Sequence, residues 1–159
     1  MSKTVHEMVA DPAFVWHGDA EFVASVQRVC DVIHATARRK GWWDKWLNPR
    51  GRVEIGPDPL LGRIMLMVTE LSEAAECVRD GQLELRFDGP DGGVKYALSN
   101  DWSELRNGFK PEGLPAELAD AVIRIFDTAR ALGIDLGYAI SVKAYHNQFR
   151  KHRHGGRLA

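Results

Sequence analysis

Apolar residues recur at helical spacing in four segments of this chain, and this pattern limits its fold more than any other feature. The segments span about residues 19–40, 60–80, 115–133 and 135–150. Gly41 and Gly81 follow the first two segments and Gly133 ends the third, as is typical where helices end. Helices joined by short links pack as a bundle, so the pattern predicts an all-α fold with four main helices.

The stretch from Gln82 to Gly113 breaks this pattern. A run of turn-forming residues, Asp88 to Gly93, stands between two segments in which apolar residues alternate. Such alternation around a turn indicates a small β-hairpin, and a loop insertion is the other interpretation. There is no repeat or low-complexity tract, so residues 1–159 are expected to form a single domain, with flexible ends at 1–18 and 151–159.

The second and third helices each carry an apolar stripe that is expected to face the core. The stripes are Ile64, Val68, Leu71, Ala75 and Val78, and Leu118, Val122, Ile125, Ala129 and Leu132. Two pairs of carboxylates point away from them: Glu70 with Glu73, and Glu117 with Asp120. Pairs spaced by three residues lie about one turn apart on one helix face, and many such pairs are solvated surface.

The face of Glu70 and Glu73 also holds the apolar residues Leu66, Ala74 and Cys77, so this helix is expected to be buried on two sides. Carboxylates in a buried face need a cation to compensate them. Mg²⁺ prefers hard oxygen ligands and leaves positions for water and phosphate, and Mn²⁺ is a plausible substitute. Packing of the two helices therefore predicts a metal site formed by Glu70, Glu73, Glu117 and Asp120.

Overall composition excludes some partners. A net charge of −1 over 159 residues argues against non-specific binding of DNA or RNA. The two cysteines, Cys30 and Cys77, fit a reduced compartment better than a disulfide framework. There is neither an apolar leader nor a membrane-length apolar run, so a cytoplasmic protein without membrane contact is expected.

The last predicted helix carries a polar stripe of Lys143, Asn147 and Arg150, opposite its aromatic side. Lysine and arginine bind phosphate well, so this stripe is a candidate phosphate site; a solvated cationic face is the alternative. Arg124 is a further candidate for binding phosphate, and neutralising the acidic cluster is the alternative. The segment from His154 to Arg157 offers backbone N–H groups and cations for a phosphate lid, or is an exposed tail.

Trp42, Trp43 and Trp46 precede the second helix, and Trp102 lies in the inserted segment. Tryptophan rings stack well on nucleobases, and Trp43 is our candidate for such a contact. A core or dimer contact is the alternative.

These motifs resemble those of a known family. The run Thr69 to Glu76, followed by Glu117 to Asp120, looks like the paired Glu-x-x-Glu and Glu-x-x-Asp motifs of the all-α NTP pyrophosphatases, which include MazG-like proteins and the dimeric dUTPases. Residues 110–127, 133–136 and 154–157, with Lys143, Tyr145, Asn147 and Arg150, are similar to MazG-like proteins of phages and bacteria. The resemblance covers roughly residues 64–157, with a weaker match at 40–44.

The resemblance implies an enzyme that cuts a nucleoside triphosphate, dNTPs above all, to a nucleoside monophosphate and pyrophosphate. It implies Mg²⁺ on Glu70, Glu73, Glu117 and Asp120, and a homodimer or homotetramer. Either Glu70 or Glu73 is expected to activate the attacking water. The inserted segment exceeds the usual family spacing, which leaves substrate gating open. Two alternatives remain: a narrower substrate such as dUTP, dCTP or a guanosine alarmone, and a helical module that binds a nucleotide or protein without catalysis.

Overall fold

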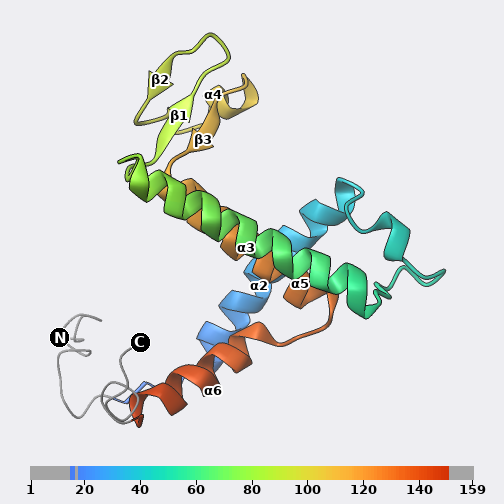
Figure 1. Cartoon of the computed structure of the whole chain (residues 1–159). Helices are drawn as coiled ribbons and strands as arrows, with labels where there is room; N and C mark the ends of the chain where they lie inside the picture. The colour runs from blue at the N-terminus through green and yellow to red at the C-terminus, as the bar shows by residue number, and fades with distance from the viewer. Residues whose placement is uncertain (1–14, 17, 151–159) are drawn as a thin grey trace.

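The computed structural model describes residues 15–16 and 18–150 and confirms a mostly helical fold (Figure 1). Its helices are α2 (Ala20–Arg39), the 3-10 helix η1 (Asp44–Trp46), α3 (Pro57–Arg79), α4 (Ser103–Arg106), α5 (Leu114–Ala131) and α6 (Leu136–Gln148). The ends predicted to be flexible, 1–18 and 151–159, lie almost entirely outside the described residues. Among the residues described, no helix has both the length and the apolar character of a membrane span.

The long helices begin where local chemistry favours a start. Asp19 caps α2, its carboxylate accepting a hydrogen bond from the Phe22 N–H at 2.7 Å, and Asp135 caps α6 in the same way. The sequence suggested that the second helix begins near Leu60, but helix α3 begins at Pro57. Proline is well tolerated in the first helical turn, where its missing N–H would have no helical acceptor, so the loop prediction for Pro57 is wrong.

Helix α5 lies at the centre of the fold. It packs against α3 and α2, while α6 packs mainly against α2 (Figure 1). Helices α3 and α5 are antiparallel: Glu70 in the middle of α3 contacts Arg124, whereas Gln82, just after α3, accepts a hydrogen bond from the N–H of Leu114 at the start of α5. The α3/α5 pair therefore forms a hairpin of helices whose connection is the inserted segment.

The inserted segment forms a small antiparallel sheet at one end of this helix pair (Figure 1). Strand β1 (Arg86–Asp88) lies between β2 (Val94–Lys95) and β3 (Lys110–Glu112), and Phe87 pairs with both Lys95 and Pro111. The hairpin interpretation of residues 82–113 is confirmed for β1 and β2. Strand β3 and helix α4 were not predicted. Lys-Pro-Glu, the sequence of β3, has little of the strand propensity that sequence patterns detect.

The large residues of the apolar stripes of α3 and α5 are exposed in one chain, contrary to our expectation, whereas Ala129 of the α5 stripe is buried as predicted. A row of mostly small residues on α3, including Ala74 and Cys77, packs against α5 instead, together with Glu70. The stripe residues are 39–54 % exposed: Ile64, Val68, Leu71, Val78, Leu118, Val122 and Ile125. On each helix these residues are rotated about 100° around the helix axis from the row that contacts the other helix, and the rotation has the same sense on both. Because the two helices are antiparallel, the exposed residues lie on one side of the pair. We call this set the α3/α5 apolar face.

Candidate metal centre

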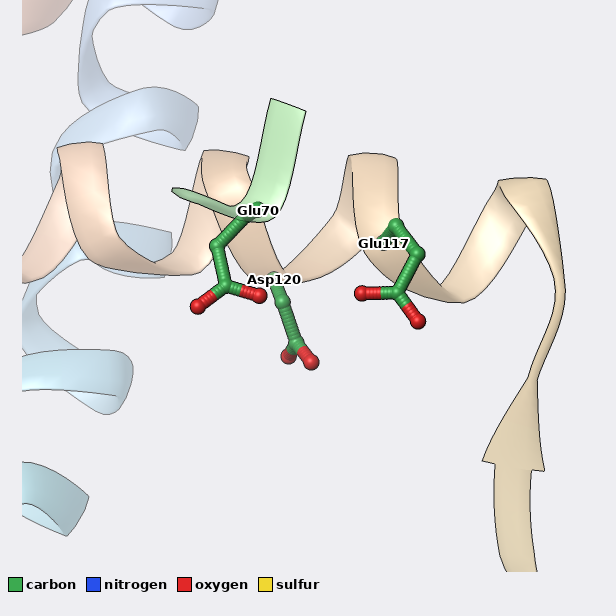
Figure 2. Close-up of side chains that lie close together, drawn as sticks. All are labelled: Glu70, Glu117 and Asp120. Atoms are coloured by element: carbon green, nitrogen blue, oxygen red, sulfur yellow. The ribbon is translucent and has the colours of Figure 1, made fainter. Parts of the chain in front are cut away.

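Packing of α3 against α5 brings three carboxylates together on the side away from the apolar face. Glu70 is buried on the contact row of α3, and Glu117 and Asp120 stand three residues apart on α5. One carboxylate oxygen from each lies within 4.8 Å of the others. Figure 2 shows the three side chains turned toward a common space. We call Glu70, Glu117 and Asp120 the carboxylate cluster.

The fourth predicted ligand, Glu73, is exposed and lies beside Glu117. Burial raises the pKa of Glu117, and the neighbouring Glu73 raises it further. Burial also raises the pKa of Asp120, with an added contribution from Glu70. The cluster therefore holds more negative charge than its surroundings favour, which is the electrostatic condition for binding a cation.

Arg124 supplies part of the missing positive charge. Its Nε and Nη2 atoms both lie 2.6 Å from Glu70 Oε1. The influence of Arg124 and of Lys110 lowers the pKa of Asp120 and so opposes the effects of burial and Glu70. Of the two roles considered for Arg124, neutralising the acidic cluster is the one that this geometry displays.

The donor set fits a hard divalent cation. Carboxylate oxygens are the ligands that Mg²⁺ and Mn²⁺ prefer, and the cluster contains neither a histidine nor a thiolate. Cys77 is buried nearby, but burial and the charge of Glu117 raise the pKa of its thiol. This cysteine therefore stays protonated and does not supply a soft ligand.

Trp43, the predicted base-stacking residue, has no exposed surface. Its indole N–H donates to the Asp127 carboxylate, at 2.9 and 3.0 Å from the two oxygens. The Arg63 guanidinium stacks 3.4 Å from the Trp43 ring centroid, and His34 Nδ1 lies 2.7 Å from Asp127 Oδ1. This network makes Trp43 a core residue, which was the alternative interpretation of the tryptophan cluster, and leaves no ring face for a base.

Trp42, by contrast, is 60 % exposed and borders a cavity of about 230 Å³ between α2, α3 and α5. Ile33, Ala37, Leu66 and Ile123 form most of its apolar wall. An engineered cavity of about 150 Å³ accepts benzene, so a ring system the size of a nucleobase fits this one. Leu66 precedes Glu70 by four residues, about 6 Å along α3, so the cavity lies one helical turn from the carboxylate cluster.

Several polar groups of this cavity are engaged within the protein, but Arg63 Nε is buried without a hydrogen-bond partner among the described residues. Arg63 Nη2 donates to the Trp42 carbonyl oxygen at 2.7 Å, and Asp127 accepts hydrogen bonds from Trp43. Neither Arg63 nor Asp127 was singled out from the sequence as a site residue. Arg63 precedes Glu70 by seven residues and so shares its helix face, which is the signal that would have found it.

The structure does not bring the remaining predicted phosphate ligands to the cluster within one chain. Lys143, Asn147 and Arg150 belong to α6 and the residues that follow it, and α6 lies at the opposite end of the fold from the inserted sheet (Figure 1). His154 and Arg157, predicted to form a lid, lie outside the described residues.

Arg124 links the carboxylate cluster to the neighbouring cavity, because it lines the cavity and pairs with Glu70. The cluster and the cavity combine hard oxygen ligands with an apolar space of nucleobase size, one helical turn apart. No family model, curated protein or solved structure matches this chain.

Proposed function

We propose that this protein is a Mg²⁺-dependent nucleoside triphosphate pyrophosphohydrolase of the MazG-like family, which cleaves a (d)NTP to a (d)NMP and pyrophosphate. The observation that carries the proposal is the cluster of Glu70, Glu117 and Asp120, with oxygens within 4.8 Å, beside a cavity that fits a base. The ordered motifs from residue 64 to residue 157, which resemble this family, support it.

Glu70, Glu117 and Asp120 would hold the metal, with Glu73 next to them. When bound, the cation neutralises phosphate charge and lowers the pKa of a coordinated water. We assign proton abstraction from the attacking water to Glu73, because Glu73 is exposed whereas Glu70 is buried and paired with Arg124. The water oxygen bonds to the α-phosphorus, the bond from that phosphorus to the α–β bridging oxygen breaks, and pyrophosphate leaves.

The base would occupy the cavity, with Trp42 at its edge. The wall is mostly apolar, and Trp43, Asp127 and Arg63 Nη2 are hydrogen-bonded within the protein, which leaves the buried Arg63 Nε as an unpaired donor in the described part of the chain. With a single such donor there, the cavity selects by shape more than by hydrogen bonding. Apolar pockets separate similar ligands by about 10- to 200-fold, whereas sites with unpaired hydrogen-bonding groups reach about 10⁴-fold or more. We therefore expect activity on several dNTPs rather than on dUTP or dCTP alone.

A second copy of the chain would cover the α3/α5 apolar face and form a homodimer or homotetramer. Seven large apolar side chains that are 39–54 % exposed in one chain make up this face, and exposed patches of this kind mark protein interfaces. A reducing cytoplasmic compartment fits Cys30 and Cys77, both free thiols.

The test is pyrophosphate release from a panel of dNTPs and NTPs with Mg²⁺. We expect release by the wild type and at least a 100-fold loss in Glu73→Gln and Glu117→Gln. Glu76→Gln is the matched control, since Glu76 is on α3 but 63 % exposed and paired with Arg79 away from the cluster. Nucleotide binding without pyrophosphate release would support the non-catalytic module instead, and full activity of Glu73→Gln would exclude its proposed role.

A further inference from the structure

The inserted sheet joins the helix pair at the end where the carboxylate cluster lies. Strand β3 passes into α5 through Gly113, whose φ of +95° and close approach to the Glu84 carbonyl leave no room for a side chain. A Cβ added at Gly113 would lie 2.3 Å from that oxygen. The path from β3 to Glu117 is therefore short and fixed, and Figure 2 shows a strand leading into the helix on the Glu117 side.

Lys110 stands on this strand, on the same face as Glu112, because side chains alternate along a strand. Its Nζ lies 2.5 Å from Glu112 Oε1, yet its side chain is 75 % exposed. The hydrogen bond that Lys110 donates to Glu112 raises the pKa of Lys110, and the more distant charges of Glu117 and Asp120 raise it further. The sheet therefore places an accessible cation within electrostatic reach of the carboxylate cluster.

The groups along the helix pair follow a definite order. Toward the inserted sheet, the cavity at Leu66 comes first, and Glu70 and Asp120 lie one helical turn further. Glu117 follows about 4.5 Å further along α5, and Lys110 on β3 comes last. A nucleoside triphosphate has the same order, with the base at one end and the terminal phosphates at the other. A base in the cavity and an α-phosphate at the cluster would direct the β- and γ-phosphates toward Lys110.

We propose that Lys110, supplied by the inserted sheet, binds the pyrophosphate portion of the substrate beyond the carboxylate cluster. This inference rests on the proposed function for the identity of the substrate. It makes the sheet part of the binding site rather than a passive insertion between α3 and α5. Lysine suits this position because its ammonium is a mobile point charge that can leave Glu112 for a phosphate oxygen.

The test compares two ligands, inorganic pyrophosphate and a deoxynucleoside monophosphate, each titrated calorimetrically in Mg²⁺ against wild type and Lys110→Met. We expect the Kd for pyrophosphate to rise about tenfold in the variant and the Kd for the monophosphate to change less than twofold. Lys110→Arg should restore most of the pyrophosphate affinity. Lys95→Met is the matched control, since Lys95 is in the same sheet but pairs with Glu104.

Three results would overturn the inference: a wild type that does not bind pyrophosphate, an unchanged Kd in Lys110→Met, or an equal loss in Lys95→Met. Because these titrations need no turnover, they separate this inference from the proposed reaction. A protein that binds pyrophosphate through Lys110 but releases none from any nucleotide would refute the reaction alone. A protein that hydrolyses nucleotides with unchanged pyrophosphate binding in Lys110→Met would refute only the role of Lys110.

Discussion

Glu117→Gln should stabilise the metal-free protein and at the same time remove its response to Mg²⁺. The Glu117 carboxylate lies beside Glu73 and has two further acidic neighbours within 4.8 Å, Glu70 and Asp120. Two unit charges at this distance repel by about 1 kcal/mol in water and about 3.5 kcal/mol at an effective dielectric of 20. Asp120 is exposed and Arg124 balances Glu70, so screening favours the lower value.

The net gain in unfolding free energy is therefore about 1 kcal/mol. The first turn of α5 loses a favourable negative charge, which offsets a few tenths of a kcal/mol. For a chain of this size, about 1 kcal/mol corresponds to a rise in Tm of about 2–4 °C. In wild type, Mg²⁺ at a hundred times its Kd should add about 2.7 kcal/mol, and in Glu117→Gln it should add much less.

Thermal unfolding is followed by circular dichroism at one protein concentration. The Tm in EDTA tests the gain in stability, and the shift of Tm in excess Mg²⁺ tests the response to the metal. The control is Glu76→Gln, which removes a glutamate of α3 outside the cluster and should change neither. A lower Tm for Glu117→Gln in EDTA would show that the cluster is not strained by its own charge. An unchanged Mg²⁺ response in that variant would show that Glu117 is not a ligand.

Three further predictions concern pH, the core and the apolar face. Because the pKa values of Glu117 and Asp120 are raised above 4.5 and 3.8, the folded state binds protons more tightly than the unfolded state. In EDTA, the unfolding free energy should therefore fall as pH rises through these raised pKa values. With Mg²⁺ present, the fall should be smaller, and urea unfolding midpoints measured at each pH check both statements. Trp43→Phe removes the indole N–H that donates to Asp127, and it should lower the unfolding free energy by about 1–3 kcal/mol in urea titrations without changing metal affinity. If the proposed oligomer forms through the apolar face, Leu71→Lys should dissociate it in analytical ultracentrifugation, whereas Val94→Lys, at an equally exposed position of 52 % in the sheet, should not.

Sequence patterns predicted the helices well because the relevant signals are local. Asp19 and Asp135 cap helices within four residues of where their hydrogen bonds form, and apolar periodicity is a property of one segment at a time. The same holds for the carboxylate pair on α5, whose spacing of three residues suffices to place both on one face. Lys110 and the cavity depend on how strands and helices meet, and no single segment carries that information.

The main error of the sequence-based prediction was which face of α3 is buried against α5. The physical cause of this error bears on function. Helix α3 has a row of small residues, such as Ala74 and Cys77, and a stripe of large ones. Small residues allow close approach of two helix backbones, which the larger side chains of Val68 and Leu71 would prevent. Hydrophobicity alone favours the larger stripe, and nothing in a single segment shows that a neighbouring helix will occupy the narrower row.

This choice of face also explains why the carboxylate cluster and the exposed apolar face occur together. If the large stripe packed against α5, Glu70 would turn about 100° away from Asp120 and the carboxylates would not meet. Burial of the small row is what assembles the cluster, and it necessarily leaves Val68 and Leu71 outside. The proposed association through the apolar face and the proposed ion binding at the cluster would thus act on opposite sides of one helix pair. Because both depend on the same α3/α5 contact, each should stabilise the arrangement that the other requires.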